Sequence, residues 1–491
     1  MFVNRTAVLV LRPATLVLFS LAVSSLAVSG AAGFARAQNP SSESNPYWGS
    51  ITVQPVSGQP IRLSLDDAVR RGLSNNLGLK EAENGEKALH GEKNEVIQVF
   101  LPTINFSADT GYYMHNLAAL GFTHSALKLF TGFFPGGQPP AGFNAITRDT
   151  LTDAKMQLTQ VLFSAPAITA FKAAGAAERS AYYAKMTARG EVVQRVATAY
   201  LRALADASEV TNAMAQVEQA QLLEQHAHDA HVAGTAANLD ELRSQVELQT
   251  QQQTLIGATN QQAKDMILLK REIGIDPEQQ IVLTDEAPFQ ELAAQTPEEL
   301  RALAYQSRQD YQNLQNQLVV YKALHSSTRA ERLPTLTFFS YYQTSTVTGV
   351  NTHGNFLAMG QLSFPIFREA KLRGDEDSAK ADLDSTTAQL DELRSHIDEQ
   401  VRAALLDVNA NAKLVDVARS NVDLATRTLS DETDRVNAGV DDNLPLVTAQ
   451  ATLAGAESNL VESLYQYNVA KLALARSAGV LEQQYRVYLG E

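Results

Sequence analysis

The sequence of 491 residues contains no cysteine. This absence excludes a disulfide framework, zinc sites with thiolate ligands, a cysteine nucleophile and a lipid-modified N-terminal cysteine. The sequence also has no phosphate-binding glycine loop and no H-E-x-x-H or G-x-S-x-G pattern. Its carboxylates are scattered among lysines and arginines, as is typical of solvated helix faces. We therefore expect neither an enzyme nor a bound cofactor.

An excess of positive charge is also absent. The chain has 40 Lys and Arg against 54 Asp and Glu, a net charge of −14. A protein that binds the phosphate backbone needs a clustered basic face, so we expect no nucleic-acid partner.

Only one long apolar run is present, and it lies near the N-terminus. Two arginines precede an apolar stretch from Ala14 to Val28, and small residues lead to Ala35-Arg36-Ala37, an A-x-A cleavage pattern. We expect residues 1–37 to be a secretory signal peptide; an N-terminal membrane anchor is the alternative. Because no other stretch of 18 apolar residues occurs, β-strands would have to make any membrane crossing.

The rest of the chain contains an internal duplication. Short segments recur in the same order: Leu101-Pro102-Thr103 as Leu333-Pro334-Thr335, Gln157-Leu158 as Gln361-Leu362, Gly234 with Asn238-Leu239 as Gly439 with Asn443-Leu444, and Gly274-Ile275 as Gly479-Val480. The two Leu-Pro-Thr segments are 232 residues apart, whereas the other paired segments are 204 or 205 residues apart. The first copy therefore has 28 extra residues between its Leu-Pro-Thr and Gln-Leu segments, and they fall within 114–153. Such insertions belong in loops.

Each copy begins with a helical stretch, at 64–99 and 297–332, which a proline ends. Segments with apolar residues at every second position follow, and period two predicts strands. A length of about ten residues suits a tilted strand that crosses a bilayer. The predicted strands are 101–113, 154–164, 333–346 and 354–367. The aromatic residues near their ends suit the girdles of a membrane barrel: Tyr112, Tyr113, Phe163, Tyr341, Tyr342 and Phe367.

Long helical hairpins are predicted next, at 166–274 and 368–480. Apolar residues step by threes and fours, which predicts coiled-coil seams: Val193, Val196, Tyr200, Ala203, Ala207, Val210, Met214 and Val217 in the first copy, and Val401, Leu405, Val408, Ala412, Val415 and Val422 in the second. Gly234 and Gly439 would end the first helix of each hairpin. Asn238 and Asn443 would cap the returning helix.

Four strands cannot close a membrane barrel, because hydrocarbon does not tolerate unpaired backbone groups. The chain must therefore associate. Two copies would give eight strands, which side chains fill, and three would give twelve, which leave a lumen.

These ordered features resemble the TolC-like outer membrane efflux proteins over about residues 61–480. The resemblance implies a mainly α-helical fold with membrane β-structure: a homotrimer with a 12-stranded β-barrel in the outer membrane of a Gram-negative cell, four strands per chain, and a long coiled-coil α-helical barrel in the periplasm. The composition of 38–60, rich in Ser, Pro, Asn and Gly, predicts an extended N-terminal segment. The duplication gives two repeats, 61–274 and 297–480, followed by a C-terminal tail at 481–491. The resemblance places the segment between the repeats, 275–296, in an equatorial region.

The resemblance also implies the function. Members of this family are passive exit ducts of tripartite efflux or type I secretion systems, held in outer membrane lipid. They dock an inner-membrane pump through a periplasmic adaptor protein, and the docking surface is the pair of hairpin tips. The implied residues are Gly234, Thr235, Asn238, Leu239, Gly439, Val440, Asn443 and Leu444. The alternative is that these glycines only end helices and these leucines only fill the core of the chain.

The same tips form the closed end of the duct in this family. Many relatives have a ring of carboxylates there, at places that Pro445 and Thr448 occupy in this chain. Asp240, Asp441 and Asp442 could form an acidic constriction that favours cations; a solvated turn is the alternative.

A histidine cluster lies near the first tip, at His226, His228 and His231. Residues at i and i+3 can share a metal ion, but His226 and His228 do not face each other on a helix. An ordinary helix surface is the favoured interpretation.

The rival function, a periplasmic coiled-coil scaffold or adaptor without a barrel, does not require the four alternating segments. The sequence does not identify the cargo.

Overall fold

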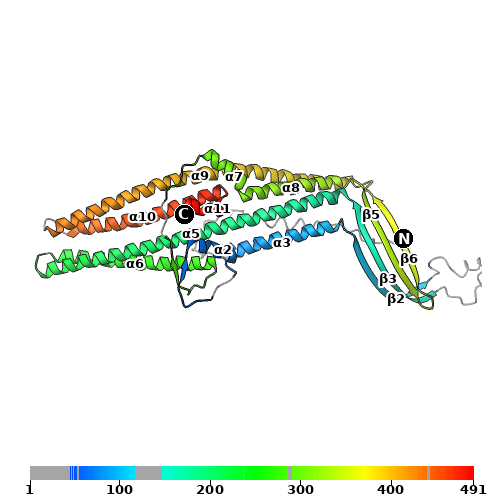
Figure 1. Cartoon of the computed structure of the whole chain (residues 1–491), viewed down its shortest axis with the longest axis horizontal. Helices are drawn as coiled ribbons and strands as arrows, with labels where there is room; N and C mark the ends of the chain where they lie inside the picture. Colours follow the sequence, from blue (N-terminus) through cyan, green and yellow to red (C-terminus); the bar gives the residue numbers. More distant parts are fainter. Residues whose placement is uncertain are drawn as a thin grey trace, which may run out of the picture.

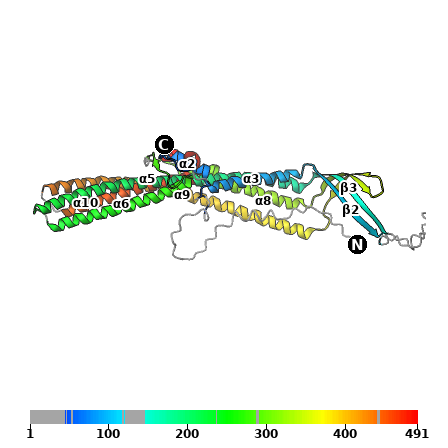
Figure 2. The same ribbon diagram turned by 90° about the horizontal axis from the view of Figure 1, so that it is seen from below.

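The computed structural model describes residues 45, 47, 49–51, 55–116, 119, 146–235, 237–285, 290–438 and 443–490. The expected signal peptide, 1–37, lies outside these residues. The chain is elongated, with a sheet at one end and the turns of two helical hairpins at the other (Figures 1 and 2).

Strands from both repeats form one antiparallel sheet, in the order β2-β3-β5-β6. Their bounds are β2 Thr103–Asn116, β3 Ile146–Phe163, β5 Thr335–Val347 and β6 His353–Ser363. β3 begins eight residues before the predicted start at 154, because its pairing with β2 continues to Ile146 opposite Asn116. β6 ends at Ser363, not at the predicted 367, since Pro365 cannot donate a ladder hydrogen bond.

Long helices lead away from the sheet. Their bounds are α3 Leu77–Gln98, α5 Ala165–Val232, α6 Asn238–Ile273, α8 Gln309–Ala330, α9 Glu369–Asn437 and α10 Asn443–Ser477. Near the sheet the neighbours are α3, α5, α8 and α9; near the turns they are α6, α5, α10 and α9. α5 has 68 residues and is therefore about 100 Å long at 1.5 Å per residue.

The two first helical stretches are each broken, whereas the sequence predicted continuous helices. α2 (Leu65–Asn75) is followed by α3, and α7 (Pro297–Ser307) by α8. The residues at the breaks, Asn76 and Arg308, have extended ψ values of 132° and 123°. They are 232 residues apart, which matches the shift between the two Leu-Pro-Thr segments. The duplication therefore extends to backbone geometry that the sequence pattern did not reveal.

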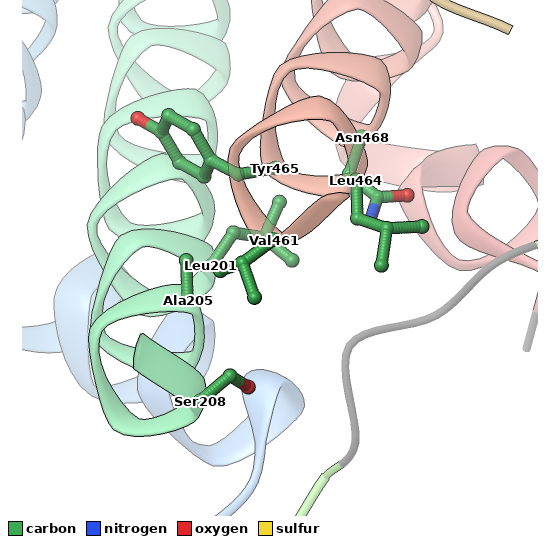
Figure 3. A pocket seen from close by; sticks show the side chains of 7 residues that line it. All are labelled: Leu201, Ala205, Ser208, Val461, Leu464, Tyr465 and Asn468. Carbon is green, nitrogen blue, oxygen red and sulfur yellow. The ribbon is translucent and has the colours of Figure 1, made fainter. Parts of the chain in front are cut away.

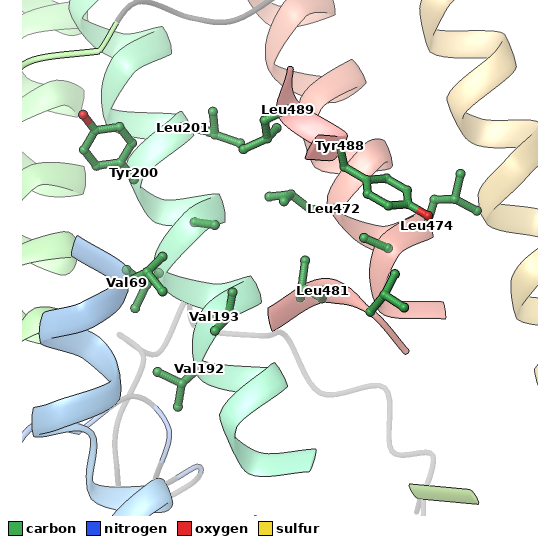
Figure 4. Close-up of a cluster of buried hydrophobic side chains, with 14 of the residues drawn as sticks. Val69, Val192, Val193, Tyr200, Leu201, Leu472, Leu474, Leu481, Tyr488 and Leu489 are labelled. Carbon is green, nitrogen blue, oxygen red and sulfur yellow. The ribbon is translucent and has the colours of Figure 1, made fainter. Parts of the chain in front are cut away.

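A belt of short elements lies beside the middle of the long helices. β1 (Ile61–Leu63) pairs in parallel with β4 (Ile281–Leu283), which lies in the segment expected to be a linker. The expected C-terminal tail instead forms α11 (Leu481–Leu489), because Leu481, Tyr488 and Leu489 share one helix face. All three are buried in a cluster with Val193 and Leu472 (Figure 4). The belt is the main core of the chain.

The coiled-coil seam of α5 follows the prediction only in part. Val193, Val196, Tyr200 and Ala203 are buried as expected, but Met214 is 56% exposed. Beyond Val210 the buried positions are Ala213, Gln216, Ala220, Leu223 and Ala227. A straight helix drifts relative to a strict seven-residue repeat, so the buried face moves to neighbouring positions. In α9, Val401, Val408 and Val415 are buried as predicted.

Candidate functional site

The first hairpin turn is built around Gly234. α5 ends at Val232, and Gly234 has a φ of +73°, a conformation that favours glycine. The Gly234 amide donates to His231 O and the Thr235 amide donates to Ala230 O, each at 2.9 Å. These two bonds form a Schellman motif. The prediction that Gly234 ends the helix is confirmed.

The returning helix begins differently from the prediction. The N-cap of α6 is Ala237, with no side-chain hydrogen bond, and Asn238 is the first helical residue. The expectation that Asn238 caps α6 is therefore wrong. In the second turn, Gly439, Val440, Asp441 and Asp442 lie outside the described residues, and α10 begins at Asn443.

Apolar side chains near both turns are open to solvent in the single chain. Leu239 is 54% and Leu444 47% exposed. Val232, Leu242 and Val246 are exposed as well. Because Leu239, Leu242 and Val246 are spaced by three and four residues, they share one face of α6. Leu239 and Leu444 therefore do not fill the core of the single chain, and they are available to another protein surface.

The charges at the first turn are paired. Asp240 lies 3.4 Å from Arg243 Nη1. His228 Nδ1 lies 2.9 Å from Glu241 Oε1, and this hydrogen bond raises the pKa of His228. His231 Nε2 is 3.9 Å from the other oxygen of Glu241. His228 and His231 thus link α5 to α6, whereas His226 is exposed and takes no part in this link.

Over the described ranges, no group of three or more His, Asp or Glu residues could hold a metal ion. None of the helices described is long and apolar enough to cross a membrane.

The edges of the helical layer are apolar and uncovered. α6 and α9 are the outermost helices near the turns. Each has exposed apolar residues on the side opposite its buried face: Leu239, Leu242, Val246, Ile256 and Ile267 on α6, and Leu406, Val417 and Leu424 on α9. The sequence analysis missed these stripes, because it assigned one seam to each hairpin. The spacing of Leu239, Leu242 and Val246 was the available signal.

One face of the sheet is mainly apolar and the other is mainly polar. Ile104, Phe106 and Tyr112 alternate along β2 and are exposed, as are Phe356 and Leu362 of β6. The opposite face has polar rows across the strands, including Ser107, Lys155, Gln343 and Asn355. β2 and β6 are open edges. This arrangement suits lipid on one face, water on the other, and further strands at both edges.

Two hollows lie between the helices in the middle of the chain. One, between α5 and α10, has a volume of about 20 Å³, room for one water molecule (Figure 3). The other, of about 660 Å³, lies between α5 and α9. Among its charged lining residues, Arg308 pairs with Asp310 and Arg476 with Glu191. Neither hollow presents a nucleophile with an adjacent base.

Comparison with known proteins gives the family. The sequence pattern of the outer membrane efflux protein family matches residues 68–274 and 300–480. A search of curated proteins found no match.

Similar solved structures include the outer membrane protein VceC of Vibrio cholerae, with 14% identity, a TM-score of 0.69, and coverage of 84% of this chain and 96% of VceC. The CmeC outer membrane channel of Campylobacter jejuni has 13% identity and a TM-score of 0.70, covering 89% and 92%. The MtrE outer membrane channel of Neisseria gonorrhoeae has 14% identity and a TM-score of 0.69, covering 88% and 95%. At these identities the likeness is one of fold.

The sequence prediction of a TolC-like fold with an internal duplication is confirmed, because the family match falls in two blocks that correspond to the two repeats. The chain belongs to the outer membrane efflux protein family, which makes it a non-enzymatic protein of the outer membrane.

Proposed function

We propose that three copies of this chain assemble into an exit duct, with a 12-stranded β-barrel in outer membrane lipid and a barrel of helices below it. The observation that carries this proposal is that, among the described residues, both edges of the layer are open at the sheet and again near the turns. β2 and β6 are unpaired edge strands, and α6 and α9 have apolar outer stripes. Because β2 and β6 run in opposite directions, β6 of one copy can pair antiparallel with β2 of the next.

The choice of three copies rests on the family and on pore width. Three chains of four strands give twelve, and a barrel of that size retains a lumen, whereas eight strands are filled by side chains. The polar rows of the sheet would line that lumen. Transport through such a duct is passive, since the chain has no nucleotide-binding motif to supply energy.

We further propose that the turns dock a periplasmic adaptor protein, which connects the duct to an inner-membrane pump. The proposed residues are Gly234, Thr235, Asn238, Leu239, Gly439, Val440, Asn443 and Leu444. The exposure of Leu239 and Leu444 supports a role in binding, because exposed leucines at a turn offer apolar knobs to a partner helix. We keep the proposal that an acidic constriction forms at Asp240, Asp441 and Asp442. The negative charge of Asp240 is partly offset by Arg243, which lies beside it.

The assembly can be tested on the α9 edge. Leu424→Glu places a charge in the proposed interface, and burial of an unpaired charge is costly, so the native mass of the detergent-extracted protein should fall from three chains to one. Ser430→Glu is the matched control, because Ser430 is exposed on a different face of the same helix. A Leu424→Glu variant that stays as large as the control would show that this edge is not an interface between copies.

Docking is tested separately with Leu444→Asp, because Leu444 is exposed near the second turn but lies on α10, outside the apolar stripes of α6 and α9. We expect the trimer to persist while binding of the cognate adaptor, measured with purified components, is lost. The alternative function, a coiled-coil scaffold without a barrel, would be indicated by a protein that needs no detergent and remains a monomer.

A further inference from the structure

A cluster of charged residues connects the first hairpin to the second, at the edge of the belt that faces the hairpin turns. Arg202 and Asp206 lie one turn apart on α5, with Arg202 Nε 3.1 Å from Asp206 Oδ1. The same Nε is 3.8 Å from Asp265 Oδ2 on α6. Arg202 Nη1 donates to Glu462 Oε2 on α10 at 3.0 Å. One guanidinium thus joins three helices.

Asp206 is nearly inaccessible to solvent. Its exposed fraction is 4%, and its Oδ2 is buried with no hydrogen-bond partner among the residues described. An ionised carboxylate with an unsatisfied buried oxygen is unfavourable, and the group takes up a proton instead. Burial and the neighbouring carboxyl group of Asp265 raise the pKa of Asp206 to about 7. Two carboxyl groups can share a hydrogen bond only when one of them is protonated.

The cluster has no counterpart in the second repeat. α6 and α10 are related by a shift of 205 residues, which places Ala470 where Asp265 stands. At the positions related to Asp206 by 204 or 205 residues are Ala410 and Asn411. A buried carboxyl pair is therefore not needed to build this part of the fold, since the other hairpin forms without one.

We propose that Asp206 and Asp265 share one proton, and that losing this proton weakens the connection between the first hairpin and α10. With the proton bound, the carboxyl pair has one negative charge and Arg202 is shared between it and Glu462. When the proton leaves, two adjacent carboxylates repel each other across the α5–α6 contact and draw Arg202 away from Glu462. We call these four residues the carboxyl latch.

The other charged and titratable groups around the latch are accounted for. Tyr465 of α10 lies with its ring 5.2 Å from the Arg202 guanidinium. Further along the same contact, Glu209 accepts from Ser458, and Glu457 accepts from Gln216. All members of the latch lie within one chain, so the inference does not depend on assembly into a trimer or on docking.

The test compares Asp206→Asn with wild type across about pH 5 to about pH 9. Asparagine keeps the size of aspartate and donates to Asp265 at every pH. Infrared difference spectra of the detergent-extracted protein should show a protonated-carboxyl C=O band that disappears near pH 7 in wild type. Hydrogen exchange in residues 253–269 of α6, corrected for its intrinsic pH dependence, should rise several-fold over the same range. Both changes should be absent in Asp206→Asn.

Glu218→Gln is the matched control, because it removes an exposed carboxylate from the same helix and should leave both pH profiles unchanged. If Asp206→Asn fails to fold, Asp265→Asn gives the same test from the other side of the pair. A wild-type protein with no carboxyl band, or with α6 exchange that does not change across the range, would overturn the proposal.

Discussion

The two repeats reach the same backbone by different chemistry. At the junction between helices and sheet, the first repeat packs Phe100 against Phe171, with ring centroids 6.4 Å apart and planes at 83°. Arg332 occupies the place of Phe100 in the second repeat, 232 residues later, and pairs with Glu376 at 2.9 Å and with Glu369 at 3.3 Å. Shared features, such as the breaks at Asn76 and Arg308 and the glycine turns, therefore determine this fold more than individual side-chain contacts do.

The largest expected effect comes from comparing two glycines. Gly234 and Gly479 both have positive φ, +73° and +77°. An added Cβ at Gly479 would lie 2.6 Å from Arg308 N, whereas at Gly234 it would meet nothing within 4 Å. Gly234→Ala should cost about 1 kcal/mol from backbone strain alone, and Gly479→Ala about 4 kcal/mol or more, because backbone must move. Thermal unfolding followed by circular dichroism measures both; equal losses would mean that the Gly479 contact is easily relieved.

A smaller loss of stability is expected at the junctions between helices and sheet, and it should depend on salt in only one of the two repeats. Phe100→Ala should lower stability by about 2 kcal/mol, a loss that salt does not change, because the contact is apolar and half-buried. Arg332→Ala should cost less, and the loss should shrink in high salt, since ion pairs that water partly reaches are weak and screened. Melting temperatures at low and high ionic strength test this pair. A salt-sensitive Phe100→Ala variant would contradict the proposed difference.

The smallest effect is expected at the hairpin turns. The pKa of His228 is raised by its bond to Glu241, so this link stabilises the folded state below the usual histidine pKa of about 6.5 and is lost as the pH rises through the folded value. Leu446 stands in place of Glu241 in the second hairpin, 205 residues later. Hydrogen exchange near residue 232 should therefore increase with pH beyond its intrinsic dependence, and His228→Gln should remove that increase. A similar change near residue 436 would indicate a cause common to both turns.

The sequence predicted the elements that depend on local patterns. Alternation indicated all four strands, and Gly234 indicated the first turn. The sequence pattern did not predict the helix break at Asn76. There the Asn76 side chain donates to Tyr47 O at 2.7 Å, and this contact joins segments that are distant in the sequence. Likewise, the spacing of Arg202 and Asp206 is visible in the sequence as an i, i+4 pair. Its meeting with Asp265 and Glu462 depends on the register of three helices.

The continuity of α5 has a mechanical consequence. The helix passes through the belt without a break, and from Arg202 to its end at Val232 it extends about 45 Å beyond it. If the belt holds α5 in place, the part of the helix beyond the belt acts as a rigid lever that pivots there. A tilt of about 10° at the belt would move the end of the helix by about 8 Å. A small displacement among a few side chains near Arg202 would therefore be amplified into a movement of several ångströms at the first hairpin turn.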